Sequence, residues 1–177
     1  MQSFVSLLRG INVGGKNLVS MEKLRSLYES LKLGNPRTYL QSGNVVFESS
    51  LPNYELATFL SKKIEQSFNV KVPVIIRSHD DLARIVENVP YAKKDLSSVH
   101  VTFLSEKPKD FPKEAIDGFV QNGEKYQMSG TEIYLMLPIG YGMTKLTNNL
   151  FEKKLRLTAT TRNWNTMAAL LKMTAVK

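Results

Sequence analysis

The sequence predicts an α+β protein made of two tandem copies of a β-α-β-β-α-β unit, each followed by a helix. Apolar runs and helical-face patterns alternate in this order up to Arg77, and the same order recurs from residue 98. The residues repeat as well. YLQSGNVVF aligns with YQMSGTEIY 87 residues later, and Arg77-Ser78 align with Arg162-Asn163 after 85 residues. This element order is typical of the ferredoxin-like fold.

The first half shows each element in turn. An apolar run precedes a glycine-rich loop, and apolar residues on one helical face follow until Gly34 ends the helix. Two β-rich runs flank Ser42-Gly43, which predicts a tight hairpin, and Pro52 is suited to open a second helix. We therefore expect a strand at 3–9, a helix between 20 and 34, a hairpin over 37–49, a helix after Pro52 and a strand at 71–77.

A further helix follows at Ser78, whose hydroxyl can cap it, with Asp81 three residues later. Pro90 ends this helix. We expect residues 1–89 to form the first ferredoxin-like half, 90–97 a linker and 98–177 the second half. The second half is expected to contain a strand at 98–104, a helix near 111–120, a hairpin pairing 124–128 with 131–137, a helix near 145–155, a strand near 157–161 and a final helix starting at NWNTM.

Composition narrows the classes of function. The chain lacks cysteine, which excludes disulfides and thiolate chemistry and suits a cytoplasmic location. Neither a secretory signal nor a membrane-spanning run is expected. Two histidines without a ligand cluster predict no metal site, and no cofactor is expected. The net charge of +8 favours an anionic small molecule or nucleic acid as partner, although it can equally serve solubility.

The loop in LLRGINVGGKN resembles the phosphate-binding pattern G-x-x-x-x-G-K-[ST], with Asn17 in place of the hydroxyl residue. A nucleotide-hydrolysing enzyme also needs a strand that ends in a metal-binding Asp, and a parallel sheet. The strands VPVII and VHVTFL end in Arg77 and Ser105, and a hairpin follows the first helix. The sequence therefore does not predict an NTPase.

The same loop can still bind an anion. Its glycines allow positive φ and close backbone approach, so that N–H groups can face an oxyanion, flanked by Arg9 and Lys16. In the alternative interpretation, the glycines only let the chain turn. Because strand one of such a unit lies beside strand three, Arg9 should lie close to Asn44. The position of Arg162 relative to this loop depends on how the two halves pack, which the sequence does not show. The expected ligand-binding residues are Arg9, Gly10, Asn12, Gly14, Gly15, Lys16, Asn17, Gln41, Ser42, Asn44, Arg162 and Asn163.

Three segments, SLLRGINVGGKN, TYLQSGNVVF and TTRNWNTM, closely resemble the bacterial domain-of-unknown-function 1697 family. The resemblance covers the whole chain and implies a compact α+β protein of two ferredoxin-like subdomains. It implies no catalytic assignment. The signature positions it implies are Arg9, Gly10, Asn12, Gly14, Gly15, Lys16 and Asn17, then Gln41, Ser42, Gly43 and Asn44, and finally Arg162, Asn163 and Trp164.

Three hypotheses for function remain. The first is a small-molecule site for a phosphorylated or carboxylated ligand or a nucleotide. The second is a nucleic-acid-binding module that stacks bases on sheet aromatics, and the third is a structural or protein-interaction domain without enzymatic activity. Ser42 and Ser129 precede glycines in hairpin turns, which accounts for them without a nucleophilic role. The candidate base-stacking residues are Phe4, Tyr39, Phe47, Phe103, Tyr126 and Tyr134.

Overall fold

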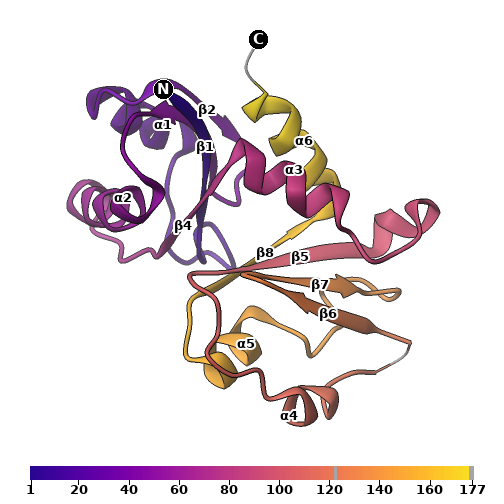
Figure 1. Ribbon diagram of the computed structural model, residues 1–177. Helices are drawn as coiled ribbons and strands as arrows, with labels where there is room; N and C mark the ends of the chain where they lie inside the picture. The colour runs from indigo at the N-terminus through magenta and orange to yellow at the C-terminus, as the bar shows by residue number, and fades with distance from the viewer. Residues whose placement is uncertain (122, 176–177) are drawn as a thin grey trace. The chain divides into compact units, whose positions relative to one another are not determined.

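The protein is a mixed α+β structure with two four-stranded antiparallel sheets. The computed structural model describes residues 1–121 and 123–175, without the side chains of 93–95. Six α-helices lie within those residues (Figure 1). The chain divides into two compact units. Unit 1 comprises Met1–Arg84 with Ala169–Lys177, and unit 2 comprises Ile85–Ala168. The expected boundaries at 89 and 98 remain a prediction.

The sheet of unit 1 has the strand order β2-β3-β1-β4, and every neighbouring pair is antiparallel. The central strand β1 pairs Phe4 with Phe47 on one side and with Ser78 on the other. The expected hairpin is confirmed, since Tyr39 pairs with Asn44 across its turn. The elements are β1 (Gln2–Leu8), α1 (Met21–Ser30), β2 (Gly34–Tyr39), β3 (Asn44–Ser49), α2 (Asn53–Phe68) and β4 (Val74–Ser78).

Helices α1 and α2 lie on the same side of this sheet and enclose the core of unit 1 (Figure 1). The apolar stripe of α2 repeats at helical spacing through Leu56, Leu60 and Ile64, all of them fully buried. Polar groups also meet inside this core, where the Tyr28 hydroxyl is 2.8 Å from Ser6 Oγ. Burial raises the pKa of Tyr28, so the phenol stays protonated and serves as a neutral hydrogen-bonding group.

Unit 2 repeats this arrangement, with strand order β6-β7-β5-β8 and antiparallel neighbours throughout. Helix α4 is shorter than the predicted 111–120, because Gly118 follows its last residue and the Phe119 amide closes a tight turn onto the Ile116 carbonyl (2.9 Å). The elements are β5 (Val99–Leu104), α4 (Lys113–Asp117), β6 (Lys125–Ser129), β7 (Glu132–Met136), α5 (Asn148–Leu155) and β8 (Ala159–Asn163).

One further helix follows the last strand of each sheet. Helix α3 (His79–Glu87) follows β4, and helix α6 (Trp164–Thr174) follows β8. The cap predicted for α3 is present, because Ser78 Oγ accepts from the Asp81 amide and Asp81 Oδ2 accepts from the Ser78 amide. Asn163 caps α6 through a 2.8 Å bond from the Thr166 amide to its Oδ1. A short 3₁₀ helix, Lys93–Ser98, overlaps the predicted linker 90–97.

The hairpin glycines generate a stability prediction. Both have positive φ, +79° at Gly43 and +62° at Gly130, but a Cβ at Gly43 would lie 2.7 Å from Leu8 Cβ and from Ile11 Cδ1. We expect Gly43→Ala to lower the free energy of unfolding by about 2–5 kcal/mol, through left-handed strain and overpacking. Gly130→Ala, where the nearest atom is 4.0 Å away, should cost only about 1–2 kcal/mol.

Urea unfolding of the full chain measures both effects. Equal losses for the two variants would show that contact with Leu8 and Ile11 does not matter. An unchanged free energy of unfolding in both would contradict the turn assignment itself.

Candidate functional site

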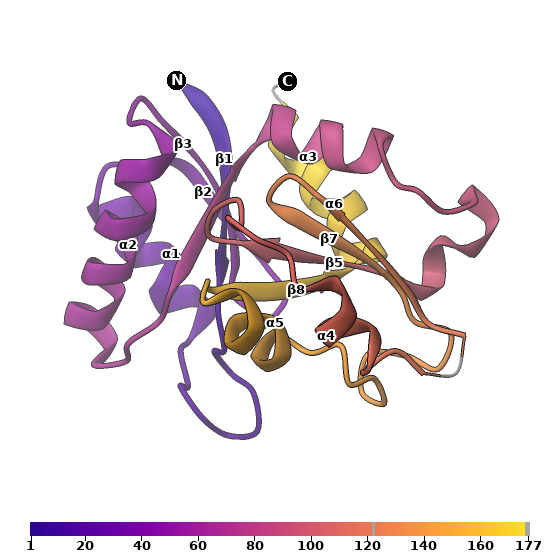
Figure 2. The ribbon, with the colours of Figure 1, turned by 60° about the horizontal axis from the view of Figure 1, so that its bottom comes forward.

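The glycine-rich loop that follows β1 is a short hairpin. Gly14 and Gly15 form its tip with φ of +56° and +72°, and the Lys16 amide donates to the Val13 carbonyl at 3.0 Å. Positive φ at two consecutive residues is the geometry of the tight turns that favour glycine. Figure 2 shows this loop extending beyond the ends of the strands. The glycines are therefore required for the turn.

Asn12 fastens this loop to its surroundings. Its side-chain amide donates to the carbonyls of Val19 (3.0 Å) and Gln41 (2.9 Å), and its Oδ1 accepts from the Val19 amide at 2.8 Å. Asn12 has a φ of +53°, a left-handed conformation that asparagine tolerates better than most residues. The Asn12 side chain therefore connects its own end of the loop to Val19 at the other end, and to Gln41 in the turn of the β2–β3 hairpin.

Two other asparagines of the motifs are also used internally. Asn17 donates through Nδ2 to the Gly10 carbonyl at 2.9 Å. Asn44 is fully buried and donates through Nδ2 to the Tyr39 carbonyl (2.8 Å) and Ser42 Oγ (3.0 Å). These amides close turns, so they are not directed at a ligand on the surface.

The first two sequence motifs lie side by side at one end of the sheet. Leu7 pairs with Asn44, and the Leu8 amide donates to the Gly43 carbonyl at 2.8 Å. On the other side, the Arg9 amide donates to the Pro73 carbonyl at 2.9 Å. The connection between α2 and β4 thus borders the loop. Pro73 was not predicted from the sequence to lie beside the loop, although the predicted fold implies that the first strand pairs with the fourth and so brings this connection close.

Three groups of the loop remain accessible to a ligand from solvent: the backbone amides of Gly14 and Gly15 and the side chain of Lys16. All three residues are exposed, and among the described residues beyond its chain neighbours no atom lies within 4 Å of a Cβ built on either glycine. Within the described part of the chain, neither glycine amide donates a hydrogen bond. Arg9 is half-buried and has interactions within the protein. The ligand-facing chemistry of the loop therefore consists of two amides and one ammonium group.

Arg162 and Asn163, the third motif, belong to unit 2. Arg162 lies in β8 rather than in a helix, is 6% exposed, and donates through Nη1 to Thr160 Oγ1 (2.8 Å) and the Thr161 carbonyl (2.9 Å). Arg77 is its counterpart in unit 1, 7% exposed and bonded through Nη1 to the Ile76 carbonyl at 2.8 Å. Two buried arginines at corresponding strand positions indicate a structural role.

The aromatic residues considered for base stacking are not available on an open sheet. Phe4, Phe47, Phe103 and Tyr134 are at most 3% exposed. The other two candidates, Tyr39 and Tyr126, are half-buried, and the Tyr126 hydroxyl donates to Asp117 Oδ1 at 2.6 Å. Bases stack on exposed rings, so these six rings form no such platform on either sheet.

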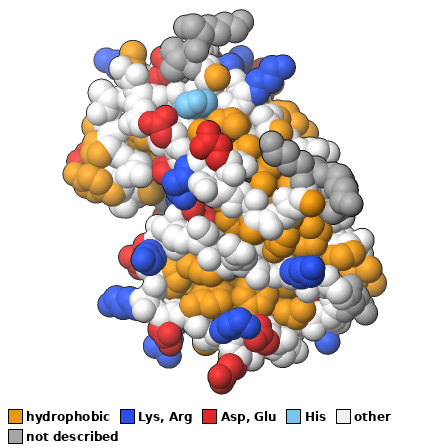
Figure 3. All heavy atoms as spheres, turned by 45° about the vertical axis from the view of Figure 1, so that its right-hand side comes forward, with side chains coloured by type: hydrophobic (Ala, Val, Ile, Leu, Met, Phe, Trp, Pro, Cys, Tyr) orange, Lys and Arg blue, Asp and Glu red, His pale blue; other side chains and the backbone are white. Residues whose placement is uncertain are grey.

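Other site classes find no support in the described residues. They contain no group of three acidic or histidine side chains arranged to hold a metal ion. Nor does any helix among them have the length and apolar character needed to cross a membrane. In Figure 3, Lys and Arg side chains stand apart on the visible face and alternate with Asp and Glu. Outside the grey atoms, neither unit shows on this face a continuous basic stripe of the kind that tracks a nucleic-acid backbone.

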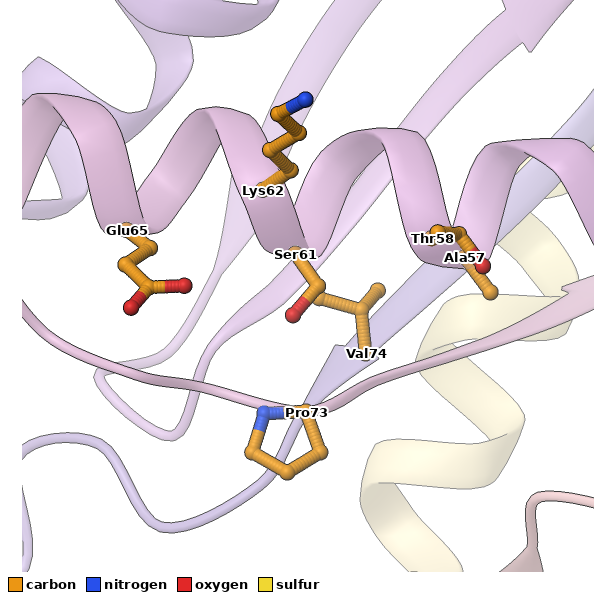
Figure 4. Close-up of a pocket in the computed structure, with 7 residues that line it drawn as sticks. All are labelled: Ala57, Thr58, Ser61, Lys62, Glu65, Pro73 and Val74. Atoms are coloured by element: carbon orange, nitrogen blue, oxygen red, sulfur yellow. The ribbon is translucent and has the colours of Figure 1, made fainter.

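A shallow depression lies between α2 and the start of β4, lined by residues that include Ser61, Lys62, Glu65 and Pro73 (Figure 4). Ser61 Oγ donates to the Val72 carbonyl at 2.7 Å, so its hydroxyl is already used. Figure 4 shows Lys62 directed away from Pro73. The depression therefore gathers no convergent set of polar groups.

Comparison with known proteins shows the fold and the family of the chain. The chain resembles the conserved bacterial protein SP0830 from Streptococcus pneumoniae, with a TM-score of 0.72, 22% sequence identity, and coverage of 98% of this chain and 99% of that one. No curated protein matches it in sequence. The model of a family described as "Protein of unknown function (DUF1697)" matches residues 1–134. The chain therefore belongs to the DUF1697 family, whose function is unknown.

Proposed function

We propose that the protein binds an anionic group, a phosphate or a carboxylate, at the tip of the loop formed by Arg9 to Asn17. The observation that carries this proposal is the pair of exposed amides of Gly14 and Gly15, which donate no hydrogen bond within the described residues. Backbone N–H groups at a glycine turn can approach an oxyanion closely, because no side chain intervenes. Lys16 adds a positive charge beside them.

The charge of the surrounding sequence supports the same proposal. The first acidic residue in the chain is Glu22, so no carboxylate in the loop competes for the amides or for Lys16. The loop extends outward beyond the ends of the strands (Figure 2). Its anion would therefore belong to a ligand that reaches the tip from solvent, held by a few charge-assisted hydrogen bonds.

The contribution of the original candidate residues differs under this proposal. Gly14, Gly15 and Lys16 contact the anion. Arg9 contributes charge from the base of the loop. The remaining candidates of unit 1, which are Gly10, Asn12, Asn17, Gln41, Ser42 and Asn44, hold the loop in place, and Arg162 with Asn163 stabilise unit 2.

We also infer that each unit has the ferredoxin-like topology and that the two arose by internal duplication. The identical element orders and the corresponding strand orders β2-β3-β1-β4 and β6-β7-β5-β8 support this inference. So does the recurrence of a serine–glycine turn in both hairpins, at Ser42-Gly43 and Ser129-Gly130.

A purely structural role for the motifs is the second candidate, favoured by the three hydrogen bonds of the Asn12 side chain. In that case, the loop only closes one end of unit 1. The nucleic-acid hypothesis rests on the net charge of +8 alone. It predicts an affinity that falls steeply with salt, with a log–log slope of about −0.7 to −0.9 per neutralised phosphate.

The anion proposal is tested by titrating the ¹⁵N-labelled full chain with inorganic phosphate and observing its amide resonances. We expect shifts centred on Gly14, Gly15 and Lys16, because the amides of the two glycines and the ammonium group of Lys16 surround the proposed anion. Lys16→Gln should weaken binding by about tenfold, the effect of one charge-assisted hydrogen bond. Lys62→Gln removes the same charge from an exposed site on α2 and should change nothing. Equal weakening by both variants, or shifts outside the loop only, would refute the proposal.

The structural role of Asn12 gives a separate prediction. Asn12→Gly keeps the positive φ but removes three hydrogen bonds, so the free energy of unfolding should fall by about 1–3 kcal/mol. Exchange of the Val19 amide hydrogen should also accelerate, since Asn12 Oδ1 accepts from it. Asn17→Gly is the matched control, because it removes one hydrogen bond at another positive φ, and its cost should be smaller. A larger cost for Asn17→Gly would show that Asn12 is not the fastening residue.

A further inference from the structure

Unit 2 contains a cavity of about 520 Å³ between the loop after β5 and the turn that joins α5 to β8. This volume lies within the range of about 300–1,000 Å³ that is usual for small-molecule sites. Its lining combines charged residues with two prolines and two leucines. It is a concave site, unlike the extended loop of unit 1, and none of its residues belongs to the motifs discussed above.

The two walls of the cavity are fixed to each other. The Ser105 amide donates to the Thr158 carbonyl at 3.0 Å, and the Thr158 amide donates to Ser105 Oγ at 3.2 Å. Pro108 and Pro112 restrict the backbone of the first wall. A site whose walls are held in this way loses little conformational freedom when a ligand enters.

Positive charge predominates in the cavity. Lys107, Lys109, Lys154 and Arg156 line it, against two carboxylates, those of Glu106 and Asp110. Within the described residues, none of these six side chains forms an ion pair. The dipole at the C-terminus of α5 favours the nearby cations Lys154 and Arg156, but Lys107 and Lys109 come from a different segment. Their convergence leaves an uncompensated positive charge.

Arg156 occupies an unusual conformation for an arginine. It follows α5 with a φ of +57°, and its amide donates to the Glu152 carbonyl. Asn69 holds the corresponding cap after α2, with a φ of +54° and an amide bonded to the Glu65 carbonyl. Glycine and asparagine are the residues that tolerate this position best. The arginine is therefore not explained by the needs of the cap.

The cavity corresponds in position to the glycine loop of unit 1. There, the Arg9 amide donates to the Pro73 carbonyl at 2.9 Å, just as Ser105 donates to Thr158 in unit 2. Both loops follow the first strand of their sheet and border the connection to the fourth. The same end of each unit thus carries a cationic loop, and in unit 2 this loop forms one wall of a cavity.

We propose that this cavity binds a phosphate-bearing small molecule with an apolar body. Lys107, Lys109 and Arg156 face the phosphate, for which a guanidinium can supply two parallel hydrogen bonds. The apolar body contacts Leu155, Leu157 and the prolines. This site is separate from the loop of Arg9 to Asn17, so neither proposal depends on the other.

The test uses phenyl phosphate as probe and inorganic phosphate as its comparison, with the ¹⁵N-labelled full chain and isothermal titration. We expect amide shifts at residues 105–110 and 154–158, and tighter binding of phenyl phosphate than of phosphate. Arg156→Asn reproduces the cap of unit 1 at Asn69, so it should preserve the thermal midpoint while weakening binding of phenyl phosphate by about tenfold. Lys109→Gln should weaken it comparably without affecting the cap.

A matched control and a site-resolved measurement make the outcome decisive. Lys125→Gln removes an exposed charge elsewhere in unit 2 and should bind phenyl phosphate as the parent does. Because the loop of Arg9 to Asn17 is also proposed to take up a phosphate group, the affinity of the cavity is measured from the amide shifts at 105–110 and 154–158. The proposal is overturned if these shifts report parent affinity in Arg156→Asn and Lys109→Gln, if Lys125→Gln weakens binding equally, or if phenyl phosphate shifts only the amides of the unit 1 loop. Equal affinity for phenyl phosphate and phosphate would refute the proposal that the ligand has an apolar body in contact with the cavity.

Discussion

The pairing of the first strand of each sheet with two antiparallel neighbours is the constraint on which the rest of this structure depends. β1 lies between β3 and β4, and hydrogen bonds at its end tie Leu8 to Gly43 and Arg9 to Pro73. These bonds fix where the glycine loop leaves the sheet and what borders it. The corresponding pairing of β5 brings Ser105 to Thr158 and thereby forms the cavity of unit 2.

In the glycine loop, some residues of one motif stabilise the turn, and others are left to bind a ligand. Asn12 and Asn17 satisfy backbone carbonyls that would otherwise lack partners at a tight turn, while Gly14 and Gly15 adopt conformations that other residues avoid. The residues that hold the turn have little capacity left for a ligand. Anion recognition, as we propose it, therefore relies on backbone amides and on one lysine.

The two units show how one framework supports different loops. Their strand orders correspond, and their second helices end in the same left-handed cap. The cap residue is Asn69 in one unit and Arg156 in the other, and the loop after the first strand is rich in glycine in one and contains Lys107 and Lys109 in the other. Because loops at a sheet end bear little of the core, they can change charge and shape without loss of the fold.

The sequence by itself determined the features that depend on neighbouring residues. The turns at Gly43 and Gly130 and the cap at Ser78 were predicted because tight turns and helix capping involve only a few consecutive residues. Tertiary structure decided which side chains meet. Asn12 bonds to Gln41, and Lys107 lies near Arg156, only because strand pairing brings distant segments together. Such contacts leave no local pattern, since they depend on the register of the whole sheet.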